Sequence, residues 1–284
     1  MSRRIKFKSK KKISSVYSNG RYEKAEKAFM QVTETREKEL GAEHPSTLSS
    51  MANLASTYRS QGRWKEAEEL EMQVIETRKR VLGAEHPSTL TSMADLASTY
   101  RSQGRWKEAE ELEVQVIETR KRALGAEHPD TLTSIANLAL TYSNQGRWKE
   151  AEELQAKELE ICSRVLGAEH PSTLTSMANL ASTYRNQGRW KEAEELFVQV
   201  IETRKRVLRA EHPSTLTSMA NLAHTWKSQG RDKEAIDLMK EAERLQRDIL
   251  GSGHHLTMGS TQALHEWQIP QEAAESASSP RESP

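Results

Sequence analysis

The sequence predicts an all-α protein built as a solenoid of antiparallel helix hairpins. A segment of 42 residues recurs along most of the chain, its apolar residues recur at helical spacing, and glycine or proline marks the predicted helix ends. The 284 residues are only 5% aromatic and 29% charged, which leaves too little apolar material for one thick core. The apolar side chains must therefore be spread along an extended stack.

The repeat is marked by the tripeptide SQG or NQG. Its glycine lies at Gly62, Gly104, Gly146, Gly188 and Gly230. The full blocks 49–90, 91–132, 133–174, 175–216 and 217–258 align without gaps, and the first two differ at only five positions. A degenerate copy over residues 13–48 precedes them. A fixed period of this quality indicates the architecture before any local assignment is made.

Each block predicts two helices. A first helix opens at Pro45, because proline suits the first helical turn and a neighbouring hydroxyl can cap the free N–H groups, and it ends at Gly62. A second helix runs from about Trp64 to Leu82, and Gly83 closes it. One such hairpin has too little apolar surface to fold alone, so its neighbours must cover it.

The two ends depart from the repeat. Residues 1–12 carry seven basic side chains and no acid; subtracting seven from the net charge of +1 leaves −6 for the rest, which argues against nucleic-acid binding by the array. The basic segment has two open interpretations, a localisation or anionic-surface patch and the remnant of a truncated first repeat. Residues 259–268 predict a capping helix, and residues 269–284 a disordered tail.

The single cysteine, Cys162, excludes an internal disulfide and fits a reducing compartment. The first dozen residues lack the apolar core of a secretory signal, and no stretch has the apolar length that spans a bilayer. We therefore expect an intracellular protein without a membrane partner, cytoplasmic or, through its basic start, nuclear. The sequence does not define the oligomeric state.

The segment NLASTYRSQGRWKEAEEL resembles the tetratricopeptide repeat. The matching residues are Leu54, Ala55, Tyr58, Gly62, Trp64 and Ala67. The 42-residue period and the LGAEHPSTL linker are similar to the kinesin light chain subtype, and the resemblance covers residues 13–258. It implies a right-handed superhelix, a tetratricopeptide (TPR) array, whose first helices line a concave groove for extended peptides. Near-identical arrays also resemble the sensor regions of nucleotide-binding STAND receptors, but this chain has no GxxxxGK[ST] loop and no heptad segment.

A ladder of polar residues precedes the core leucine of each first helix and is predicted to face this groove. The ladder consists of Asn53, Asp95, Asn137, Asn179 and Asn221. An amide can donate to and accept from an extended peptide backbone, and the resemblance implies that asparagines in this place contact bound peptide. The alternative is that they bond the neighbouring helix.

Basic residues follow the ladder by six positions. They are Arg59, Arg101, Arg185 and Lys227. Arginine binds carboxylates in a fork geometry, so the groove is expected to favour acidic peptides. The block 133–174 differs at Leu140 and Ser143, which predicts an apolar peptide residue near Leu140 and acids near Arg101 and Arg185. The alternatives are solvated helix ends and neutral drift in that block.

No catalytic set is present, since the sequence has neither GxSxG nor HExxH. The five His-Pro pairs lie 42 residues apart and do not converge on a metal. We interpret the recurring tryptophans as packing residues and the glutamates as a solvated face. The sequence thus predicts a non-enzymatic protein- or peptide-binding scaffold without cofactor or metal. The alternative is the ligand-sensing region of a STAND or NB-ARC-type receptor whose ATPase part lies elsewhere.

Overall fold

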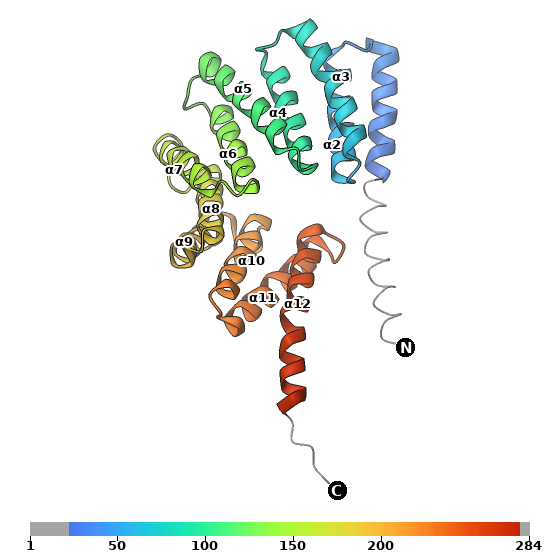
Figure 1. Cartoon of the computed structure of the whole chain (residues 1–284). Helices are drawn as coiled ribbons and strands as arrows, with labels where there is room; N and C mark the ends of the chain where they lie inside the picture. Colours follow the sequence, from blue (N-terminus) through green and yellow to red (C-terminus); the bar gives the residue numbers. More distant parts are fainter. Residues whose placement is uncertain (1–22, 279–284) are drawn as a thin grey trace. The chain divides into compact units, whose positions relative to one another are not determined.

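The computed structural model describes residues 23–278, with side chains up to residue 268, and over that range it contains helices and turns but no strand (Figure 1). The predicted basic segment 1–12 and the first helix of the degenerate block lie outside the described residues. The all-helical fold predicted from the repeat is confirmed.

Each full block forms the predicted hairpin. The first helices are α2 (Pro45–Ser60), α4 (Pro87–Ser102), α6 (Pro129–Asn144), α8 (Pro171–Asn186) and α10 (Pro213–Ser228). The second helices are α3 (Trp64–Leu82), α5 (Trp106–Leu124), α7 (Trp148–Val165), α9 (Trp190–Leu208) and α11 (Asp232–Leu250), and a helix over residues 23–40 precedes them. The boundaries predicted from proline, tryptophan and glycine agree with these ranges.

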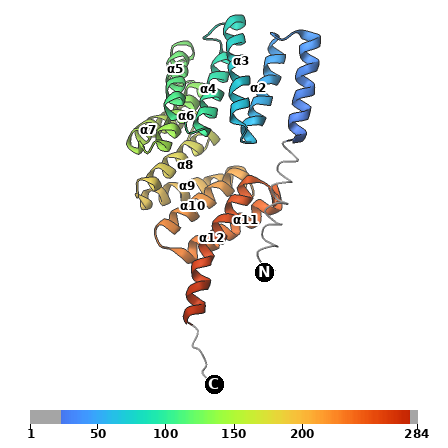
Figure 2. The same cartoon turned by 45° about the vertical axis from the view of Figure 1, so that its right-hand side comes forward.

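The chain divides into two compact units, one ending at Val165 and the other beginning at Leu166. Within each unit, helices that follow one another in the sequence pack side by side, and the first helices of successive blocks also touch, as α2 and α4 do in the first unit and α8 and α10 in the second. Figure 2 shows the same neighbour-to-neighbour packing from another side. Each unit is therefore a stack of hairpins.

The core is shared between blocks. In the first unit, Ile75 of α3 packs in one buried cluster with Leu90 and Met93 of α4 and Val116 of α5. Each second helix also carries an alanine with no exposed surface, such as Ala109, and in the second unit this alanine, Ala193, lies in one buried cluster with Ala181 of α8. A block consequently buries its apolar stripe only when the next block is present.

The first helices are capped by histidine, where the sequence had predicted a hydroxyl. His44 Nδ1 accepts a hydrogen bond from the backbone N–H of Ser46 at 3.1 Å, while the Thr47 hydroxyl donates to the Gly41 carbonyl at 2.9 Å and so joins the new helix to the end of the preceding one. The same Nδ1 cap recurs at His86, His128, His170, His212 and His254. The linker histidines thus have a structural role that spacing alone did not reveal.

Glycine closes the second helices in a backbone conformation that side chains rarely adopt. Gly83 has φ 99° and ψ 157°, and Gly125 and Gly251 are similar. Arg209 occupies this place after α9 with φ 79° and ψ 162°, and it is the only residue other than glycine with positive φ in the described chain. This region of backbone space costs a side-chain-bearing residue on the order of 1–3 kcal/mol.

The last helix, α12 (His255–Ser278), packs on α11. Its Ala263 and Trp267 pack in one buried cluster with Ile236 and Met239, so this helix covers the final repeat. Its bounds differ from the predicted 259–268, because His254 caps it earlier and it continues beyond Pro270 into a segment assigned to the tail. That segment is rich in alanine and glutamate, which favour helix.

Candidate functional site

The five ladder residues lie on equivalent positions of the first helices, each one residue before a buried leucine. Asn53 is exposed, and Asp95, Asn137, Asn179 and Asn221 are half-buried. Within the described part of the chain, the four asparagine amides make no hydrogen bond to any other residue, so they do not tie neighbouring helices together. We call this surface of the first helices, in each unit, the ladder face.

Arginines link one rung of the ladder to the next through the backbone. Arg59 on α2 donates from Nη1 to the Asp95 carbonyl of α4 at 3.0 Å, and Arg101 on α4 donates to the Asn137 carbonyl of α6 at 3.3 Å. In the second unit Arg185 on α8 donates in the same way to the Asn221 carbonyl of α10. These arginines are half-buried across two helices rather than extended at solvated helix ends.

Buried glutamates lie against two of these arginines. Glu71 and Glu113 are each 3% exposed. Arg101 Nη1 lies 3.2 Å from Glu113 Oε1, whose other oxygen accepts from Thr141 at 2.6 Å, and Arg59 Nη1 lies 3.7 Å from Glu71 Oε1. Burial raises the pKa of both carboxyls, that of Glu71 to about 7.

The prediction that the glutamates form a solvated face is wrong at these positions. Glu71 and Glu113 lie four residues after the buried alanines of their helices, on the inward stripe, and Phe197 and Met239 occupy the corresponding places in later blocks. That alignment with two large apolar residues is the signal in the sequence that could have revealed their burial.

The block 133–174 changes both members of this pair. Ser143 replaces the arginine and Gln155, only 1% exposed, replaces the glutamate. A buried carboxylate without its cation would be costly, and an amide of the same shape removes that charge. The loss of the arginine at Ser143 is therefore accompanied by the loss of the buried acid at Gln155. Leu140 on α6 is half-buried.

The basic residue of the last block is also paired. Lys227 Nζ lies 3.0 Å from Asp232 Oδ1, the residue that replaces tryptophan at the start of α11. Next to it on the ladder face, His224 meets the Trp267 ring edge-on with centroids 5.0 Å apart. The helix α12 thus contributes an aromatic side chain beside the ladder face of the second unit.

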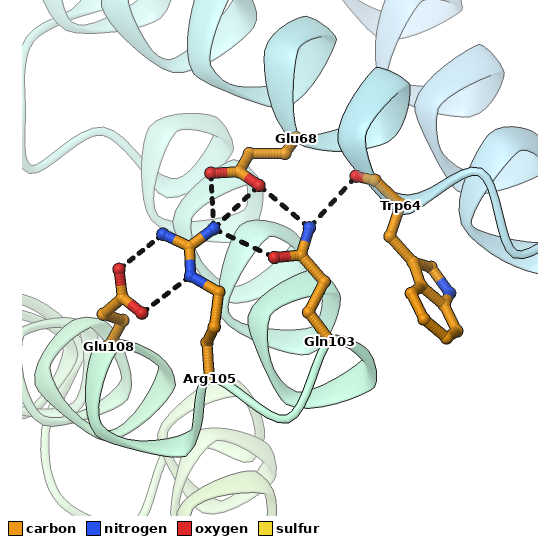
Figure 3. Close-up of polar contacts among 5 residues, drawn as sticks. All are labelled: Trp64, Glu68, Gln103, Arg105 and Glu108. Carbon is orange, nitrogen blue, oxygen red and sulfur yellow. Dashed lines mark hydrogen bonds and ion pairs between the residues drawn. The ribbon is translucent and has the colours of Figure 1, made fainter.

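A second polar arrangement joins the blocks at their hairpin loops (Figure 3). The Arg105 guanidinium binds Glu68 of the preceding block at 2.7 Å, Glu108 of its own block and Gln103, and it stacks 4.1 Å over the Tyr100 ring. The same bracket forms around Arg63, Arg147 and Arg231. Its charges are neutralised within the protein.

Shallow pockets lie beside these brackets. One of about 600 Å³ is lined by residues that include Trp64, Gln103 and Arg105. Trp64 is 41% exposed and points away from the bracket, and the other recurring tryptophans are exposed to a similar extent, so none of them is fully buried in the core. No ladder residue lines the pockets described at these loops.

Among the described residues, no group of three or more histidine, cysteine or acidic side chains is placed to hold a metal ion. Cys162 is buried, and its thiol donates to Glu158 Oε1 at 3.1 Å. No helix in the described range has the length and apolar character needed to cross a membrane.

Comparisons with known proteins agree with the hairpin stack. Models of the tetratricopeptide repeat match residues 14–46, 47–88 and 89–130, and also 130–206 and 178–248. No curated protein matched the chain.

Solved structures are similar as well. The nearly identical TPR-like repeats of a protein designated a kinesin light chain from Podospora anserina share 38% identity with this chain, with a TM-score of 0.58, or 0.60 for a point variant of the same repeats, and the match covers 72% of this chain and 97% of that one. BtubC (BKLC) from P. vanneervenii shares the fold at 18% identity and a TM-score of 0.64, over 81% of this chain and 92% of that one. The chain therefore belongs to the tetratricopeptide repeat family, with repeats of the kinesin light chain-like kind.

Proposed function

We propose that this protein is a non-enzymatic scaffold that holds extended peptide segments of other proteins against the ladder face. The observation that carries this proposal is the set of asparagine amides that are accessible to solvent and make no hydrogen bond within the described chain. Each amide offers one acceptor and two donor hydrogens, which matches the alternating N–H and C=O groups of an extended backbone. Such contacts bind many sequences with little side-chain selectivity.

Side chains around the ladder would supply the selectivity. The basic residues favour acidic peptides, and half-buried Leu140 offers an apolar contact next to Asn137. Asp95 is the one rung with a negative charge, so it disfavours an acidic residue of the ligand at that place. Membership of the tetratricopeptide repeat family supports a role in binding proteins. The acidic peptide as the ligand class is our proposal.

The alternative is that the array is the sensor region of a STAND-type receptor. The near-identity of its blocks supports this, because near-identical arrays resemble the sensor regions of such receptors. Gene sequence flanking the coding region tests this: an in-frame P-loop segment would favour the receptor.

Replacing one rung tests the ladder. A random peptide library displayed on phage is enriched on the wild-type chain, and the enriched peptides are then measured against Asn137→Ala and Asn144→Ala. Both asparagines lie on α6, but the exposed Asn144 is outside the ladder and serves as the matched control. We expect N137A to weaken binding about two- to tenfold, as loss of a neutral hydrogen bond implies, and N144A to leave it unchanged. Equal affinities for all three proteins, or no enrichment on the wild type, would contradict the proposal.

A further inference from the structure

The basic residues beside the ladder differ in whether the protein itself neutralises them. Arg59 has Glu71 at 3.7 Å, and Arg101 has Glu113 at 3.2 Å. Lys227 has Asp232 at 3.0 Å. Three of the four ladder-face cations are therefore already paired with a carboxylate.

Arg185 is the exception. The helix position that carries Glu71 and Glu113 in the first unit carries Phe197 in the block of Arg185, and this ring has no exposed surface. The only hydrogen bond of the Arg185 guanidinium is a long one, 3.4 Å to the Asn221 carbonyl, and no carboxylate among the described residues lies within ion-pair distance of it. Its partial burial lowers the pKa of Arg185, and no neighbouring acid opposes this effect as Glu113 does for Arg101.

The second unit also lacks a countercharge for the buried arginine of its second helix. Arg204, 5% exposed, donates to the Ser214 carbonyl at 2.8 Å and the Ser218 hydroxyl at 2.7 Å, which are both neutral. In the first unit the equivalent Arg78 feels the charge of Asp95, which also raises its pKa against the effect of burial. The second unit has Asn221 at the place of Asp95, so this countercharge is missing.

We propose that Arg185 is the carboxylate-binding residue of the ladder face and that its ligand is an aspartate or glutamate side chain of the bound peptide. The planar guanidinium presents a fork of N–H donors that a carboxylate accepts in pairs. The Nη1 bond to the Asn221 carbonyl uses one donor hydrogen and leaves the others for the ligand. Because Phe197 occupies the position of Glu71 and Glu113, no acid at that position competes with the ligand. His224 lies near Arg185. Desolvation lowers the pKa of His224, the positive charge of Arg185 lowers it further, and the charge of Glu266 on α12 opposes both effects.

This inference rests on the proposed peptide-binding function and selects one arginine among the ladder-face cations. Arg59 and Arg101 would bind a ligand acid only in competition with Glu71 and Glu113. An acidic ligand residue is consequently expected on the second unit, beside α8 and α10.

The test compares variants of the full chain for binding to a capped hexaglutamate peptide, with capped hexaglutamine as the uncharged control. Binding is measured by calorimetry at low ionic strength and pH 8, above the pKa of about 7 of Glu71. We expect Arg185→Gln to weaken hexaglutamate binding about tenfold or more, as the loss of charged hydrogen bonds implies. Lys205→Gln removes an exposed cation from α9 and controls for net charge. The double variant R101S/E113Q copies the natural Ser143 and Gln155 pair and removes the other arginine without leaving a buried acid. Lys205→Gln should stay within about twofold of wild type, and R101S/E113Q should weaken hexaglutamate binding less than R185Q does.

A reciprocal variant leaves Arg185 untouched and so does not depend on the folding of R185Q. Glu113→Gln keeps the shape of the side chain but removes the charge that neutralises Arg101, and we expect a second hexaglutamate site to appear in the calorimetric stoichiometry. Unchanged binding by folded R185Q would overturn the proposal, as would E113Q without a second site. A wild type that binds hexaglutamate no better than hexaglutamine would overturn it too, while enriched neutral peptides that respond to N137A would still support the ladder.

Discussion

At the scale of single residues, charge inside this protein changes in pairs. Arg101 occurs with buried Glu113, whereas Ser143 occurs with buried Gln155, so these two blocks contain either both charges or neither at these positions. Two blocks depart from this rule. In the last block Met239 takes the place of the acid and Lys227 is paired with Asp232 instead, whereas the block with Phe197 retains a half-buried arginine without an acid. A departure of this kind costs stability, and a bound anion would offset the cost.

The acid Glu71 should make stability depend on pH. Its folded-state pKa is raised to about 7 by burial, above the ordinary value of 4.5, so folding favours its protonated form. Its stabilising contribution is full below about pH 4.5 and is lost as the pH rises through 7, a change of about 3 kcal/mol by linkage.

Urea unfolding of the wild type and of Glu71→Gln, measured between pH 4.5 and pH 8, checks this. The glutamine variant should gain stability relative to the wild type as the pH rises, because its amide does not ionise. A difference between the two proteins that stays constant with pH would show that Glu71 keeps an ordinary pKa in the fold.

At the scale of the helices, proline, tryptophan and glycine predicted nearly every boundary, since these residues act through local backbone geometry. The side chain predicted to cap each first helix, a hydroxyl, was wrong. His44 precedes proline in a segment interpreted as a linker, and recognising its Nδ1 as the acceptor requires knowing the turn that brings it to the Ser46 N–H. The burial of Glu113 was missed for a related reason: periodicity assigns a residue to a face, but depth depends on the neighbouring block.

Removing one histidine cap should destabilise its helix. His86→Ala deletes the acceptor for the Ser88 N–H, which lies 3.1 Å from Nδ1, and should cost about 1 kcal/mol. His86→Asn should retain most of the stability, because asparagine caps helices well. Thermal or urea denaturation of both variants tests the role of the cap, and equal losses for alanine and asparagine would rule it out.

At the scale of the whole molecule, packing is between neighbours. Successive helices pack together within each unit. Neighbouring residues of a ladder face come from first helices of successive blocks. The period in the sequence was enough to predict this arrangement and the equivalent positions of the ladder. It could not show which ladder-face cations are neutralised. The carboxylates that pair with them lie on the second helices, at one position for Glu71 and Glu113 and at another for Asp232.

Neighbour-only packing predicts local damage. Ala109 has no exposed surface where α4 and α5 meet, and Ala109→Leu should overpack this contact by about 1–3 kcal/mol. Hydrogen exchange should quicken in α4, α5 and the helices beside them, while α10 and α11 keep the protection of the wild type. Uniform loss of protection along the chain would mean that the array unfolds as a single cooperative unit.

The repeated Arg105 bracket has a consequence for the length of the array. Every junction in which it occurs presents a glutamate from the block before and receives an arginine from the block after, so the joining surfaces are interchangeable. If recombination within the gene removed residues 49–90, Arg105 would meet Glu26 as Arg63 now does. Loss or gain of a whole block thus preserves the bracket at the new junction, and such an array can change its length by 42 residues in one genetic event while keeping this contact between blocks.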